Sequence, residues 1–74
     1  MGGETLVKVF PNEMEARLWA GVLEDEGIRS MIKPHGVGYG GWGQSAFLPH
    51  GVYVLTENIE NARAIIQNGE EERG

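Results

Sequence analysis

The spacing of apolar residues changes twice along the chain from the period of a strand to that of a helix. Residues 5–10 (TLVKVF), 28–33 (IRSMIK) and 52–55 (VYVL) alternate in character and are rich in β-branched and apolar residues, which predicts three strands. Residues 13–26 and a segment that begins at Asn58 carry apolar residues every three or four positions, which predicts two helices. The predicted order is βαββα, which restricts the chain to an α+β fold.

Local signals mark where the two helices begin and end. Asn12 followed by Glu15 is typical of a helix N-terminus, where the Asn side chain accepts a free backbone N–H. Gly27 suits the left-handed residue that ends a helix. By the same reasoning Gly69 is expected to end the second helix, and residues 70–74 are expected to form a frayed, solvated tail.

The element order predicts a single ferredoxin-like domain over residues 1–74. Each helix follows a strand, and right-handed crossovers place both helices on one face of a small antiparallel sheet. The other sheet face is then bare, and one edge lacks the fourth strand of a complete ferredoxin-like fold. A chain of 74 residues with no cysteine buries a small core, so association with a further surface would help to stabilise it.

The alternation in the strands predicts which side chains occupy each face of the sheet. Those expected to face the helices are Val7, Val9, Ile28, Ile32, Val52 and Val54. Those expected on the bare face are Leu6, Phe10, Met31, Tyr53 and Leu55, beside Lys8, Arg29 and Lys33. An exposed apolar patch usually marks an interface, which predicts a homodimer or homotrimer formed through the bare face. The alternative is that the loop or the tail folds across it.

The segment 34–50 (PHGVGYGGWGQSAFLPH) is the leading candidate for a binding site. A connection this long without regular structure usually has a function in a compact domain. Its glycines and aromatic rings suit contact with a partner protein or a small effector, unless the rings fold back over the bare face. The candidate binding residues are His35, Gly38, Tyr39, Gly41, Trp42, Phe47 and His50.

The sequence of this loop allows two further interpretations. His35 and His50 stand in matching Pro-His-Gly triplets at the two ends, where they could share a zinc or nickel ion, although turn chemistry also explains the triplets. Residues 36–41 match G-x-G-x-x-G, but dinucleotide binding requires a helix after the motif and here a strand follows. The first interpretation leaves a small-ligand or metal sensor as the alternative function.

Charge and motif content exclude several classes of protein. Six Lys and Arg against eleven Asp and Glu give a net charge of −5, the wrong sign for nucleic acid or anionic membranes. The chain lacks cysteine and a nucleophile-elbow motif, so we expect no enzyme and no cofactor. A subunit that completes an enzyme site with another chain is the remaining catalytic option. Because the N-terminus, residues 1–4, is acidic and lacks the basic and apolar regions of a secretory signal, we expect a cytoplasmic protein.

Three segments together resemble a family of small bacterial signal-transducing proteins of unknown function. They are 6–16, which contains LVKV and NEMEA, 23–28 (LEDEGI), and 51–54 (GVYV) before the Ala62-Arg63 helix. The resemblance covers nearly the whole chain. It implies a ferredoxin-like fold akin to the nitrogen-regulatory PII proteins, whose long loop between the second and third strands contacts partners. The corresponding segment here is 34–50, and the resemblance implies no catalytic residues.

Overall fold

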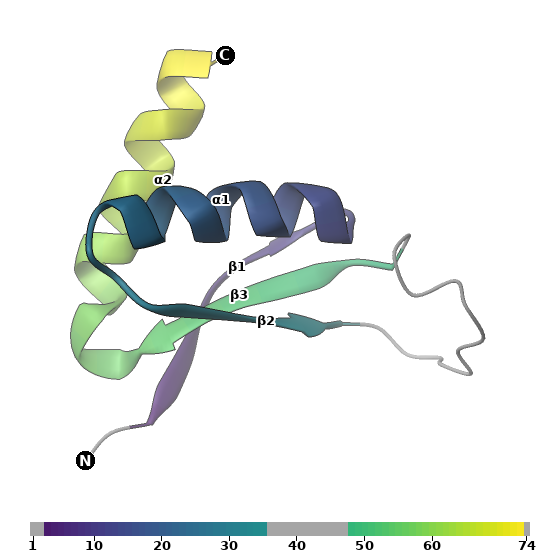
Figure 1. The fold of residues 1–74 in the computed structure, drawn as a ribbon, viewed down its shortest axis with the longest axis horizontal. Helices are drawn as coiled ribbons and strands as arrows, with labels where there is room; N and C mark the ends of the chain where they lie inside the picture. The colour runs from purple at the N-terminus through teal and green to yellow at the C-terminus, as the bar shows by residue number, and fades with distance from the viewer. Residues whose placement is uncertain (1–2, 36–47, 74) are drawn as a thin grey trace.

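The computed structural model describes residues 3–35 and 48–73, and its elements follow the predicted βαββα order (Figure 1). The elements are β1 (Glu4–Phe10), α1 (Glu13–Asp25), β2 (Ser30–Pro34), β3 (His50–Leu55), the 3₁₀ turn η2 (Thr56–Asn58) and α2 (Ile59–Arg73). All three predicted strands and the first predicted helix lie within two residues of an observed element at each end. The α+β class is confirmed.

The three strands form one antiparallel sheet in the order β1-β3-β2, which is consistent with a ferredoxin-like arrangement. Val52 and Val54 lie two residues apart on the central strand and therefore point to the same face. Both are buried in one cluster with Leu23 of α1 and Ile66 of α2. Both helices therefore cover one face of the sheet, as predicted, and the opposite side is called the open face below.

The signals predicted for the ends of α1 are confirmed. The Oδ1 atom of Asn12 accepts a hydrogen bond of 2.8 Å from the backbone N–H of Glu15, and residues 26 and 27 end the helix with Gly27 at a φ of 87°. Glu13 and Arg17, one turn apart, form an ion pair through both the Nε and Nη2 atoms of the arginine, at 2.9 and 2.7 Å. Local sequence therefore determines this helix.

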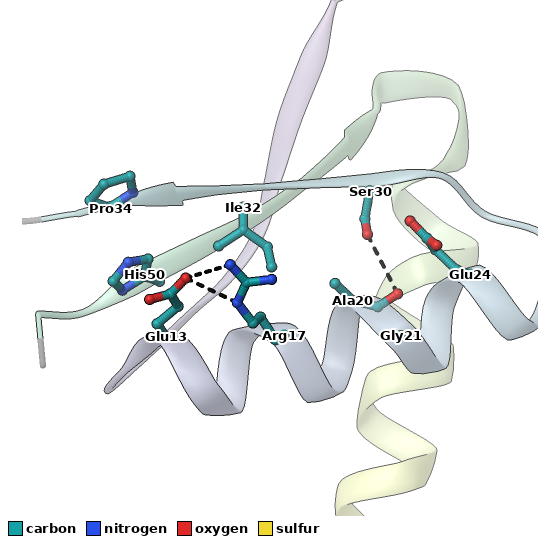
Figure 2. A pocket seen from close by; sticks show the side chains of 9 residues that line it. All are labelled: Glu13, Arg17, Ala20, Gly21, Glu24, Ser30, Ile32, Pro34 and His50. Carbon is teal, nitrogen blue, oxygen red and sulfur yellow. Dashed lines mark hydrogen bonds and ion pairs between the residues drawn. The ribbon is translucent and has the colours of Figure 1, made fainter. Parts of the chain in front are cut away.

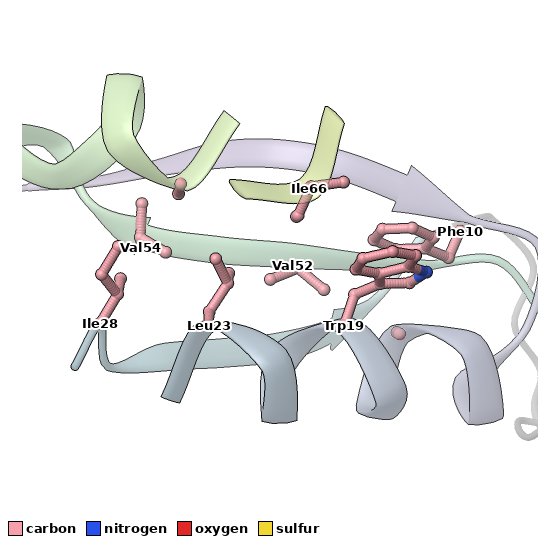
Figure 3. Packing of buried hydrophobic residues seen from close by; sticks show 9 residues of the cluster. Phe10, Trp19, Leu23, Ile28, Val52, Val54 and Ile66 are labelled. Carbon is pink, nitrogen blue, oxygen red and sulfur yellow. The ribbon is translucent and has the colours of Figure 1, made fainter. Parts of the chain in front are cut away.

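The core lies between the sheet and the two helices (Figure 3). Phe10 at the end of β1 stacks on Trp19 of α1, with ring centroids 6.4 Å apart and ring planes at 11°. Such aromatic pairs contribute about 0.5–1.5 kcal/mol beyond the area they bury. The other buried residues of the cluster are Ala16, Leu23, Ile28, Val52, Val54, Ala62 and Ile66.

The predicted faces of Val9 and Phe10 are wrong. Phe10 was expected on the open face as an interface residue, but its side chain is only 2% exposed and packs in the core, whereas Val9 is 38% exposed. The cause is a β-bulge: Leu6 pairs with Tyr53 and Lys8 with Val52, so Val7 is an extra residue in β1. One extra residue shifts the alternation of every residue after it to the other face.

The same bulge moves Lys8 away from the open face. Its ammonium group forms an ion pair with Glu70 of α2 and lies 5.6 Å from the centre of the Phe10 ring. Lys8 therefore links β1 to the last turns of α2, on the helix side of the sheet.

The predicted end of the second helix is also wrong. Helix α2 continues through Gly69 to Arg73, so residues 70–73, expected to be a frayed tail, are helical. Gly69 lies against the ring of Trp19: a Cβ atom at this position would be 2.6 Å from Cζ3. Arg73, one turn later, lies 5.9 Å from the centre of the same ring. Gly69 is thus a point of close helix packing, and the helix does not end there.

Candidate functional site

The open face carries a group of apolar side chains that nothing covers in the part of the chain that the structure describes. Met31, Leu55 and Val9 are 45%, 42% and 38% exposed, and Leu6 and Tyr53 are partly exposed. Register places Tyr53 opposite both Leu6 and Met31, so all three strands contribute to this surface. Four of the five predicted interface residues are here, and Val9 takes the place of Phe10.

Tyr53 is the centre of a polar network on the open face. Its hydroxyl lies 2.8 Å from Nε2 of His35, and the Nζ atom of Lys33 lies 4.7 Å from the centre of its ring. The same ammonium group is 3.1 Å from a carboxylate oxygen of Glu4 on the far edge strand. Exposed ion pairs and cation–π contacts contribute about 1 kcal/mol or less each, so this network orients the ring more than it stabilises the fold.

Gly51 leaves room for the His35 ring on the open face. A Cβ atom on this residue of the central strand would be 3.0 Å from the His35 ring and 2.8 Å from Cδ1 of Leu6. The absence of a side chain therefore lets the imidazole and the leucine lie over the backbone of β3. An amphipathic Tyr–His pair within an apolar surface suits a protein interface, because the rings supply contact area and the polar atoms supply direction.

The two histidines lie on opposite faces of the sheet. Pro34 and His50 are cross-strand partners and share the helix-covered face, so the next residue, His35, points to the open face. His50 is buried, and its Nδ1 atom donates a hydrogen bond of 2.7 Å to the Leu48 carbonyl. The sheet therefore separates the imidazoles that the sensor hypothesis requires at one metal ion, and the described residues contain no cluster of three metal-binding side chains.

The remaining loop candidates lie outside the described residues. They are Gly38, Tyr39, Gly41, Trp42 and Phe47. The ends of the loop are described: Pro34 and His50 pair across the sheet, and the N–H of His35 donates to the Pro49 carbonyl at 2.7 Å. The two strands that carry the loop are therefore tied together at its base.

Sequence reasoning missed a groove between α1 and the outer edge of β2 (Figure 2). The groove has a volume of about 520 Å³. Its lining residues are Glu13, Arg17, Ala20, Gly21, Glu24, Ser30, Ile32, Pro34 and His50. The helix residues recur at the spacing of one helix flank and include two small ones, Ala20 and Gly21. That spacing was the available signal, but a flank with charged residues is also typical of a solvated helix surface.

Comparisons with known proteins identify a family but no individual relative. A family model described as "Putative prokaryotic signal transducing protein" matches residues 6–70. Searches of curated proteins and of solved structures find no match. The matched range covers the whole segment 34–50 and nearly all of the strands and helices. Only the first two residues of β1 and the last turn of α2 lie outside it. Neither helix among the described residues has the length and apolar character needed to cross a membrane.

Proposed function

The chain belongs to this signal-transducing family, and on that premise we propose that it is a non-enzymatic regulatory module that binds a partner protein or a small effector. The observation that carries the proposal is the open face, which combines exposed Met31 and Leu55 with the oriented Tyr53–His35 pair. Exposed apolar surface of this kind is typical of interaction sites. The family match supports the signalling role, and the surface supports the binding.

The segment 34–50 is the proposed contact with the partner or effector. Its base is held by the hydrogen bond from the His35 N–H to the Pro49 carbonyl, and His35 at this base belongs to the open face. A ligand held by the loop would therefore lie at the end of the sheet, next to Tyr53. The family resemblance implies a fold akin to that of the PII proteins, and the loop at the same position in those proteins contacts partners, which favours this assignment.

The open face is also the proposed site of self-association, as a homodimer or homotrimer. Lys33 and Glu4 on this face form an ion pair, and Arg29 lines the same surface beside Met31 and Leu55, so a second copy would meet apolar side chains, a neutral ion pair and one further cation. Burying them would add apolar contact area to a domain of 74 residues, whose own core is small.

Partner binding by the loop is tested with the double variant Tyr39→Ala, Trp42→Ala. The variant and the wild type are compared for capture of the same partner from lysate of the host, with Met14→Ala on the exposed side of α1 as the matched control. We expect the double variant to lose capture while its circular dichroism spectrum stays that of the wild type. Undiminished capture would refute the role of the loop.

Self-association is tested by sedimentation velocity. Met31→Glu together with Leu55→Glu places two like charges on the open face and is expected to give a monomer. The control is Met14→Glu, which adds a charge at a 78% exposed position on the other side of the molecule. A wild type that sediments as a monomer at 100 μM would refute an oligomer formed through this face.

A further inference from the structure

Among residues 3–35 and 48–73, no strand pairs with the outer edge of β2, which lies next to a groove. The sheet order places β2 at one side, and β3 pairs with its inner edge over residues 30–34. Figure 2 looks into the groove from this edge, with β2 along one wall and α1 along the other. Unpaired edges of this kind accept an additional strand, which is a common mode of peptide recognition.

The hydrogen bond between the His35 N–H and the Pro49 carbonyl fixes which backbone groups of β2 point outward. These two residues are direct partners in the antiparallel register, so hydrogen-bonded pairs follow at every second residue, 33 with 51 and 31 with 53. The intervening residues Ser30, Ile32 and Pro34 direct their backbone groups away from β3. The edge therefore offers two N–H donors, since proline has none, and three carbonyl acceptors.

The side chains of those same residues line the groove. Ser30, Ile32 and Pro34 are on the helix-covered face; Ile32 lies over Arg17, and the Ser30 hydroxyl donates a hydrogen bond of 3.5 Å to the Ala20 carbonyl (Figure 2). A Cβ atom at Gly21 would meet no atom within 4 Å, so the space beside α1 is open. A strand added to β2 would place the residue opposite Ile32 in this space, because directly paired residues share a face.

The charged side chains of the groove indicate which residues a bound strand would carry. Its charged side chains are Glu13, Arg17 and Glu24, with a net charge of −1, and Arg17 is already bound to Glu13. Glu24, beside Ser30 at one end of the groove, forms no ion pair among the described residues (Figure 2). We propose that the groove binds an extended peptide strand of a partner protein, with an apolar residue opposite Ile32 and a Lys or Arg two residues away, beside Glu24. This inference rests on the proposed function, because it names the kind of partner.

A second copy of the chain fits this edge less well. Two β2 strands paired about Ile32 would bring the two α1 helices together in opposite directions, with Glu13 of one copy next to Glu24 of the other. Each Glu24 would then meet a Glu13 whose charge is already balanced by Arg17, so a second copy would bring no opposite charge to Glu24. A basic strand meets the opposite sign, which is why the peptide is the assigned occupant.

The test uses three synthetic peptides and ¹⁵N-labelled full-length protein. The parent is acetyl-Thr-Lys-Thr-Val-Thr-Lys-Thr-amide, which presents lysine two residues from the valine in either strand direction. One control replaces both lysines with glutamate, and the other carries an N-methyl group on the valine. We expect the parent to shift the amide resonances of Ser30, Ile32 and Gly21, and each control to bind about tenfold more weakly or worse.

Two protein variants with matched controls test the groove itself. Gly21→Leu fills the groove and is expected to weaken the parent peptide at least tenfold, whereas Ala64→Leu on exposed α2 surface leaves binding unchanged. Glu24→Lys is expected to reverse the preference, so that the glutamate peptide binds more tightly than the lysine peptide, and Glu60→Lys on α2 is its control. Urea unfolding of each variant checks that the fold is intact.

Three results would overturn the assignment. The first is equal binding of the N-methylated peptide, and the second is peptide-induced shifts confined to the open face. The third is a concentration-dependent shift of Ser30 and Ile32 without peptide, which would assign the edge to a second copy. If one of these results is found and the loop variant still loses partner capture, the proposed function stands and only the assignment of the β2 groove fails.

Discussion

Replacing Gly69 with alanine is expected to destabilise the domain, although alanine is the better helix former. In a helix interior, alanine is favoured over glycine by about 0.8–1.0 kcal/mol. Against this gain, a Cβ atom at position 69 would lie 2.6 and 2.8 Å from two atoms of the Trp19 ring. Overpacking of this kind typically costs about 1–3 kcal/mol. The expected net loss is therefore about 1 kcal/mol.

The magnitude depends on whether Trp19 can move. Its ring is 5% exposed, stacks on Phe10 and has Arg73 near it, so a shift of the indole would disturb the largest aromatic contact of the core. The matched control is Gly21→Ala on α1, where a Cβ atom meets nothing within 4 Å. This variant has the propensity gain without the clash and is expected to stabilise the domain by about 0.5–1 kcal/mol.

Urea unfolding followed by circular dichroism at 222 nm distinguishes the two variants. With a slope near 1 kcal/mol per molar urea, as for small domains, the midpoint falls by about 1 M for Gly69→Ala and rises by up to about 1 M for Gly21→Ala. In thermal unfolding, 1 kcal/mol corresponds to about 4–8 °C in a domain of this size. A midpoint for Gly69→Ala at or above that of the wild type would refute the reasoning, since it would mean that Trp19 yields without cost.

Three further predictions use the same unfolding assay. Phe10→Ala removes a buried ring and should lower the free energy of unfolding by about 3–5 kcal/mol. Val9→Ser on the open face should change it by less than about 0.5 kcal/mol. A larger loss for Val9→Ser than for Phe10→Ala would contradict the position of the bulge. Tyr53→Phe removes the hydrogen bond to His35 and should lower the free energy of unfolding by about 0.5–1.5 kcal/mol. It should also shift the NMR resonances of the His35 imidazole, and unchanged resonances would contradict that contact. Lys8→Ala should cost less than about 1 kcal/mol, and the loss should shrink in 1 M salt, because the pair is exposed; a loss independent of salt would point to packing instead.

Some features of the candidate site follow from local sequence patterns, and others depend on contacts between distant segments. Alternation in the strands predicted that Leu6, Met31, Tyr53 and Leu55 lie together, and the structure places them on one face. The separation of the two histidines was not predictable from the spacing, because it depends on the register of β2 against β3 at the base of the loop. The groove was missed because a helix flank and a strand edge form it only when they meet.

The sequence by itself determined the elements, their order and the start and end of α1. These follow from hydrophobic periodicity, from the Asn12 cap and from the left-handed Gly27, all of which act over a few residues. Only the tertiary structure decided the face of Phe10 and the role of Gly69. One extra residue in β1 is fixed by its pairing with β3, and a glycine that would end an isolated helix is instead the residue that lets α2 approach the Trp19 ring. Both are contacts between segments distant in sequence, which local patterns do not contain.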